Sequence, residues 1–172
     1  MRVVSTGTAA RNGGRLTPTR PVCIALGANE GDPATALRRA VEALACGDAL
    51  RGIRVSMPRW TTPVGPVPQP DYLNAALIAE TDWEPEPLLA FLHAVESSLG
   101  RHRDDEVRWG PRAIDLDLLL LGDLIRDTAS LRLPHPEMTR RRFVLEPLAD
   151  IAPGAIHPTS GKTVAELLAA LP

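Results

Sequence analysis

The feature that most constrains the fold of this chain is a short run in its second half, where two aspartates come directly before an apolar stretch. Asp115 and Asp117 are separated by one leucine and are followed by an unbroken run of leucines, 118–121. Acids that alternate with leucines and then give way to an aliphatic run predict a strand that enters a buried sheet. Because side chains at i and i+2 of a strand share a face, both carboxylates project together, while Leu116 and Leu118 face the core. We therefore expect a sheet-based fold that carries two carboxylates near the start of a buried strand.

The paired carboxylates also indicate a metal site. Two neighbouring carboxylates repel each other and stay ionised when a cation lies between them. Hard oxygen ligands suit Mg²⁺, which takes one or two carboxylates and completes its shell with water and substrate phosphates. Arg108 and Arg112, just upstream, offer positive charge for the same phosphates. The pattern indicates a Mg-nucleotide site, although an Asp-x-Asp pair by itself is also typical of a solvated strand start.

The composition bounds the class of protein. The chain has 172 residues, 23% of them charged and 44% hydrophobic, which is ordinary for one globular domain. No apolar run approaches the length of about 18 residues that a membrane span needs, and a net charge of −2 argues against general nucleic-acid binding. The spacing of Cys23 and Cys46 fits buried thiols and no disulfide framework. We expect a cytoplasmic location and a monomer.

The order of the expected elements predicts a fold class. Residues 1–20 carry arginines, no acid and no hydrophobic periodicity, so we expect a disordered tail, although such a start is also typical of a transit peptide. A single domain then covers residues 21–172. Expected strands cover 22–26, 53–60, 72–80 and the run from 115; expected helices follow Asp32 and Asp82, cover 139–149 and follow Thr163, with a hairpin element around 124–131. This order predicts an α+β, ferredoxin-like (split βαβ) antiparallel sheet with helices packed on it.

The acidic run also carries a family resemblance. Residues 108–117, Arg-Trp-Gly-Pro-Arg-Ala-Ile-Asp-Leu-Asp, resemble almost letter for letter the signature of the 6-hydroxymethyl-7,8-dihydropterin pyrophosphokinases of folate biosynthesis. Segments 26–32, 63–76, 96–103 and 133–143 resemble other parts of the family pattern in the same order. The resemblance spans about residues 21–160 and implies the same ferredoxin-like fold.

The resemblance implies a role for each matching residue. The catalytic positions are Arg101, Arg112, Asp115 and Asp117, and the two aspartates are the ligands of two Mg²⁺ ions. The nucleotide-binding positions are Arg103, Trp109, His135 and Arg141. The pterin-binding positions are Thr61, Pro63, Val64, Tyr72, Asn74, Trp109 and Phe143. The acids 104–106 depart from the family pattern, which has a further Lys or Arg there, and His93 and His157 match nothing and are interpreted as surface residues.

The implied activity is transfer of pyrophosphate from MgATP to the hydroxymethyl group of the reduced pterin, with release of AMP. The implied partners are therefore ATP and a reduced pterin. One alternative is another Mg-dependent nucleotidyl or phosphoryl transferase on the same fold. A second is a non-catalytic RNA-binding module, which needs stacking aromatics on its central strands; the chain lacks the corresponding Arg/Lys-Gly-aromatic run.

Overall fold

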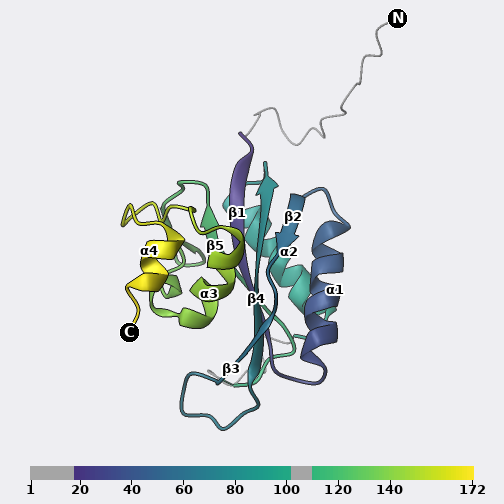
Figure 1. Cartoon of the computed structure of the whole chain (residues 1–172). Coiled ribbons are helices and arrows are strands. Elements are labelled where there is room, and N and C mark those ends of the chain that lie inside the picture. Colours follow the sequence, from purple (N-terminus) through teal and green to yellow (C-terminus); the bar gives the residue numbers. More distant parts are fainter. Residues whose placement is uncertain (1–17, 102–109) are drawn as a thin grey trace, which may run out of the picture.

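The computed structural model describes residues 18–101 and 110–172, and its frame is an antiparallel sheet with helices on both faces (Figure 1). The main strands are β1 (Arg20–Ala28), β2 (Arg51–Val55), β4 (Tyr72–Thr81) and β5 (Asp115–Leu121). They lie in the order β2-β4-β1-β5, and the short β3 (Arg59–Thr61) also pairs with β4. Each of these pairings is antiparallel, so the predicted antiparallel sheet with packed helices is confirmed.

The sheet separates two hydrophobic cores. Helices α1 (Pro33–Ala45) and α2 (Pro85–Ser98) cover one face, and α3 (Arg142–Ile151) and α4 (Val164–Ala169) lie on the other (Figure 1). Leu116 and Leu118 of β5 pack into the core of α1 and α2, as expected. Because side chains alternate along a strand, Asp115 and Asp117 point to the face of α3 and α4.

The leucine run reaches both cores because β5 is irregular. Its register against β1 shifts after Leu118, which pairs with Ile24, so that Leu120 pairs with Cys23. Leu119 and Leu120 therefore both pack with α3 and α4, and Leu121 returns to the other core. A run that is apolar on both faces suits a strand covered by helices on both sides.

The helices begin where the sequence carries local signals. Asp32 caps α1 by accepting a hydrogen bond from the Thr35 N–H at 3.2 Å, and Pro33 follows it. Thr163 and Glu166 form a reciprocal capping box at the start of α4. Helix α2 begins at Pro85 rather than directly after Asp82, and α3 begins at Arg142, after the short 3₁₀ turn η2 (Met138–Arg140).

Several expected boundaries and exposures differ in the structure. The single strand expected at 53–60 is two strands, because Pro58 has no N–H to pair and the buried Ser56 hydroxyl instead accepts from the Ala76 N–H at 2.9 Å. Strand β1 begins at Arg20, which pairs with Thr81. The hairpin element is confirmed as β6 (Arg126–Asp127) and β7 (Arg132–Leu133).

Two exposure predictions are wrong. Cys23 is buried as expected, but Cys46 follows the last residue of α1 as its C-cap and is exposed. His157, interpreted as a surface residue, is only 8% exposed. Its Nδ1 atom accepts the Ser160 N–H at 3.3 Å, and its backbone N–H donates to the Lys162 carbonyl at 2.8 Å. The turn before α4 therefore encloses this histidine.

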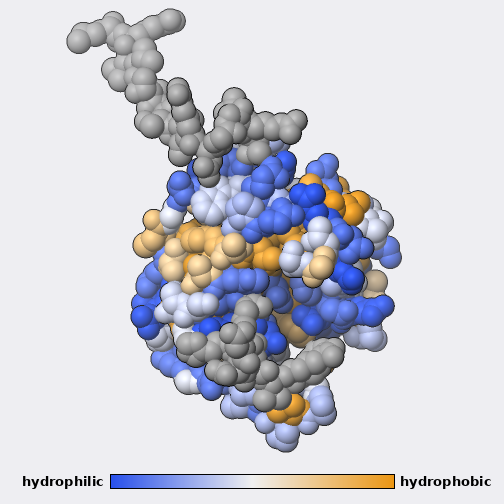
Figure 2. All heavy atoms as spheres, turned by 180° about the vertical axis from the view of Figure 1, so that it is seen from behind, coloured by the Kyte–Doolittle hydropathy of each residue, from blue (hydrophilic) through white to orange (hydrophobic). Residues whose placement is uncertain are grey.

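The outer surface is mixed. Viewed from the back of Figure 1, hydrophilic side chains surround a band of apolar ones (Figure 2). Single exposed apolar side chains, such as Ile125 and Ile156, are ordinary on a protein surface. Within the described ranges, the helices are too short or too polar to cross a membrane.

Candidate active site

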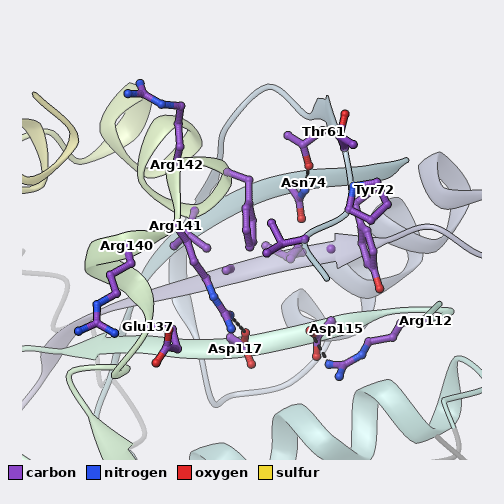
Figure 3. Close-up of a pocket in the computed structure, with 18 of the residues that line it drawn as sticks. Thr61, Tyr72, Asn74, Arg112, Asp115, Asp117, Glu137, Arg140, Arg141 and Arg142 are labelled. Carbon is purple, nitrogen blue, oxygen red and sulfur yellow. Dashed lines mark hydrogen bonds and ion pairs between the residues drawn. The ribbon is translucent and has the colours of Figure 1, made fainter. Parts of the chain in front are cut away.

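A pocket of about 620 Å³ lies against the sheet face to which the two aspartates point. This volume is typical of small-molecule sites. Its walls come from β1, from the β3–β4 region, from the start of β5 and from the segment before and into α3 (Figure 3). The pocket therefore joins four stretches of the chain that are far apart in the sequence.

Most of the predicted site residues line this pocket. The predicted pterin-side residues that do so are Thr61, Pro63, Val64, Tyr72, Asn74 and Phe143. The predicted metal and phosphate residues that do so are Arg112, Asp115, Asp117, His135 and Arg141. Arg101 is buried behind the pocket lining and contacts Asp115. Arg103, Trp109 and the acids at 104–106 lie outside the described residues.

The acid pair lies in the middle of the pocket (Figure 3). Asp115 pairs across the sheet with Gly27 and Asp117 with Ala25, so small residues flank both carboxylates. Burial, and secondly the negative charge of Asp115, raise the pKa of Asp117 well above its usual value. The arrangement therefore favours a cation that would offset the repulsion between the two carboxylates.

Arginines approach the acid pair from two sides. Arg112 donates from Nη1 to Oδ2 of Asp115 at 2.8 Å, and Arg101 donates to the other oxygen, Oδ1. On the opposite side, Nη1 of Arg141 lies 3.8 Å from Oδ2 of Asp117. Each carboxylate thus has cationic neighbours that can also bind phosphate oxygens.

His135 lies beside the same carboxylate, with Nε2 3.8 Å from Oδ2 of Asp117. Its burial, and secondly the charge of Arg141, lower its pKa below the usual value. The imidazole is therefore mostly neutral at neutral pH, and it contacts ligands as a hydrogen-bonding group rather than as a cation.

Sequence reasoning missed Glu96, which has no exposed surface. This carboxylate accepts from the Arg101 guanidinium and from the Leu116 N–H, the latter at 2.8 Å. Since Leu116 lies between the two aspartates, Glu96 fixes the start of β5 from helix α2. A signal was present in the sequence: Glu96 follows Leu92 by four residues, so it lies on the apolar face of the helix, where a charged group needs a partner.

At the other end of the pocket, an amide is held in a fixed orientation. The Asn74 Nδ2 atom donates to Oγ1 of Thr61 at 2.7 Å. A Cβ atom at Gly27 would lie 2.7 Å from Oδ1 of Asn74, so only glycine leaves room for this amide. Gly27 is thus a second residue that sequence reasoning did not assign to the site.

Tyr72 and Asn29 connect the loops around the pocket. The Tyr72 hydroxyl donates to the Gly110 carbonyl at 2.9 Å. Asn29, only 4% exposed, donates to the carbonyl of Pro70 at 2.9 Å and accepts from the Arg112 N–H at 2.8 Å. Because these bonds join the end of β1 to the loops before β4 and before β5, they fix the backbone of Arg112 beside the acid pair.

The donor set fits a magnesium ion held together with phosphates. Within residues 18–101 and 110–172, no group of three or more His, Cys, Asp and Glu side chains could enclose a metal ion. An enclosing cage is not needed for Mg²⁺, which is usually held by one or two carboxylates while water and substrate phosphates complete its shell. Asp115 and Asp117 form such a pair.

Comparisons with known proteins agree with this geometry. A sequence profile of the 7,8-dihydro-6-hydroxymethylpterin-pyrophosphokinase (HPPK) family matches residues 23–153. The chain belongs to this family. The same enzyme name, 2-amino-4-hydroxy-6-hydroxymethyldihydropteridine pyrophosphokinase, is carried by a relative from Pseudomonas aeruginosa that is 41% identical over 88% of this chain and 91% of its own. A relative of that name from Bacillus subtilis is 46% identical over 74% of this chain and 75% of its own.

A solved structure shows the same fold. The HPPK-DHPS protein of Plasmodium falciparum with pteroate matches with a TM-score of 0.68 at 14% identity. The match covers 91% of this chain and 43% of the solved chain, so the chain spans less than half of that structure. At this identity the likeness shows the shared architecture of HPPK domains.

Proposed function

We propose that the pocket around Asp115 and Asp117 carries out the reaction of the HPPK family, transfer of pyrophosphate from ATP to 6-hydroxymethyl-7,8-dihydropterin in folate biosynthesis. The observation that carries the proposal is the acid pair flanked by arginines. It lies between a fixed amide at one end of the pocket and a His–Arg cluster at the other. The two ends suit the two substrates, a flat heterocycle and a polyphosphate.

The pterin would occupy the end of the pocket formed by β3 and β4. A bicyclic pterin needs aromatic faces and an amide that matches its donor and acceptor edge. Asn74 presents such an amide, held by Thr61, while the rings of Tyr72 and Phe143 line the same pocket. Pro63 and Val64 would form the wall, and Trp109 stays a prediction because it lies outside the described residues.

The phosphates would lie over the acid pair. Asp115 and Asp117 would hold two Mg²⁺ ions, which when bound neutralise phosphate charge and lower the pKa of the attacking hydroxyl. The hydroxymethyl oxygen would attack the β-phosphorus and lose its proton to solvent, the bond from that phosphorus to the α,β-bridging oxygen would break, and AMP would leave with that oxygen. No residue of the chain needs to become covalently modified, because such transfers depend on positioning and electrostatic stabilisation.

The arginines would change partners during the reaction. Arg101 and Arg112 both bond Asp115 in the structure. If a cation were held at that carboxylate, the two guanidinium groups would be free to bind phosphate oxygens that gain charge in the transition state. His135 and Arg141 would contact the nucleotide, and the same role for Arg103 stays a prediction.

Four properties of the whole protein belong to the same proposal: its fold class, its domain organisation, its oligomeric state and its location. We assign the sheet to the ferredoxin-like class, supported by the strand order β2-β4-β1-β5 and by the helices α1 and α2 between strands. We also expect one domain over residues 21–172, a monomer and a cytoplasmic location.

The alternative activities are not favoured. Another Mg-dependent nucleotidyl or phosphoryl transferase would not need a pterin end, and the family match covers the segments that form both ends of the pocket. An RNA-binding module would need a basic sheet face, and here acids occupy the pocket side of β5.

The experiment that tests the proposal measures AMP release from ATP with and without pterin, each with and without Mg²⁺. We expect AMP when both the pterin and Mg²⁺ are present. AMP or ADP formed equally without pterin would favour a different transferase or an ATPase. Pterin and ATP left unchanged under all conditions would favour a non-catalytic binding module.

A further inference from the structure

Three consecutive arginines lead into helix α3, and their surroundings differ. Arg142 donates to the carbonyls of Leu171 and Pro172 at 3.2 and 2.8 Å, which ties it to the C-terminal segment. Arg141 lies 3.8 Å from Asp117. Arg140 is exposed and lines the pocket, and its guanidinium has no hydrogen bond or ion pair to any residue that the structure describes. Among the described residues, it is thus a pocket cation that no side chain neutralises.

The position of Arg140 assigns it to the end of the pocket away from the pterin. In Figure 3 it lies beyond Asp117 and Arg141, on the opposite side of the acid pair from Thr61, Asn74 and Tyr72. Its backbone is fixed by the turn η2, in which the Arg140 N–H donates to the Glu137 carbonyl at 3.1 Å. The buried Met138 anchors the same turn.

We propose that Arg140 binds the phosphate that stays with the nucleoside, the α-phosphate of ATP and the phosphate of AMP. This inference rests on the proposed function, because it takes the acid pair as the place of the two transferred phosphates. A phosphate on the side of the pair away from the pterin then belongs to the nucleotide that leaves. A planar guanidinium that pairs with no side chain in the described ranges suits such a phosphate, to which it can donate two parallel hydrogen bonds.

The test measures by calorimetry the binding of four ligands: AMP, Mg-pyrophosphate, a non-hydrolysable α,β-methylene analogue of ATP, and the pterin. The Arg140→Ala variant should bind AMP and the analogue about tenfold more weakly, since a hydrogen bond to a charged group is lost. Its affinities for Mg-pyrophosphate and for the pterin should stay within about twofold of wild type. Arg142→Ala is the matched control. Arg142 also belongs to the pocket lining, but its side chain points away from the acid pair in Figure 3 and bonds the C-terminal segment, so its loss should leave all four affinities unchanged.

The outcomes separate this inference from the proposed function. Equal losses of AMP affinity in Arg140→Ala and Arg142→Ala would overturn the inference, because both would then act through general surface charge. Unchanged AMP binding in Arg140→Ala, an equal loss for Mg-pyrophosphate, or a wild type that binds the ATP analogue but not AMP would also overturn it. Failure of the proposed function has a different signature, in which wild type forms no AMP in a pterin-dependent way.

Discussion

At the scale of single residues, the site depends on charged side chains that are held in position by other charged side chains. Glu96 is completely buried, yet it holds both the Arg101 side chain and the N–H of Leu116, between the two aspartates. Removing one partner of a buried ion pair leaves the other charge uncompensated, which costs more than the pair itself contributes. The sequence predicted Arg101 and Asp115 as site residues, but the carboxylate that connects them became evident only from the packing of α2 against β5.

A substitution at Glu96 tests this connection. Glu96→Gln keeps the size of the side chain and an oxygen for the Leu116 N–H, but it removes the charge that faces Arg101. We expect the free energy of unfolding, measured in urea without ligands, to fall by about 1–3 kcal/mol. Binding of an ATP analogue should weaken as well, because Arg101 loses its fixed position. A variant with wild-type stability and wild-type nucleotide affinity would show that Glu96 positions nothing.

His157 gives a prediction on pH at the same scale. Burial lowers its pKa below the ordinary value of 6.5, so the unfolded chain takes up a proton at a higher pH than the folded protein. Its contribution therefore leaves stability unchanged above pH 6.5 and reduces it as the pH falls through that value.

His157→Asn retains an acceptor for the Ser160 N–H but does not titrate. Urea unfolding of the two proteins between about pH 7.5 and 5 checks the effect. The stability of the wild type should fall more on acidification than that of the variant. Parallel curves for both proteins would contradict the assignment of this histidine as a buried, neutral group.

At the scale of elements, local signals placed the helices better than they placed the strands. Asp32 followed by Pro33 marks the start of α1, and Thr163 marks the start of α4, because caps act within one turn of the chain. The break between β2 and β3 depends on Pro58, which the sequence shows, and also on the hydrogen bond from the Ala76 N–H of β4 to the Ser56 hydroxyl, which it does not. A hydrogen bond between segments that are distant in the sequence does not change the hydrophobic pattern along the chain. The pattern at 53–60 therefore predicted one continuous strand.

The pairing of β1 with β4 gives a prediction about the pterin end. Gly27 lies opposite Asn74, and a Cβ atom at Gly27 would press on the Asn74 amide oxygen. Gly27→Ala should therefore displace the amide from Thr61 and weaken pterin binding by about tenfold, the effect of losing about one or two hydrogen bonds. Nucleotide affinity should change little, because the arginines lie elsewhere in the pocket.

A double-mutant cycle supplies the control. If Gly27 acts through the amide, Asn74→Ala should lower pterin affinity by a similar factor, and the two changes together should cost little more than either one. Additive losses would mean that Gly27 affects the pterin pocket by another route.

At the scale of the whole molecule, the family motifs and the fold converge on one pocket. Segments as distant as Gly27, Asn74, Asp115 and Arg141 line it together. Eleven of the residues predicted from sequence lie along that lining, and Arg101 contacts it from behind. Residues such as Glu96, Gly27 and Arg140 could not be assigned in the same way. Their importance follows from burial, from close approach, or from the lack of a side-chain partner within the described ranges, and only the folded arrangement defines these properties.

The most direct test of the central claim, that pyrophosphoryl transfer takes place at this acid pair, is pterin-dependent AMP formation by Asp117→Asn. The aspartate points into the pocket and repels Asp115, so the variant should unfold at the same urea concentration as wild type or at a higher one. AMP formation should fall by about a thousandfold or more, since an isosteric amide cannot hold a cation as a carboxylate does. A stable variant that forms AMP at a rate near wild type with an unchanged Mg²⁺ requirement would contradict the account.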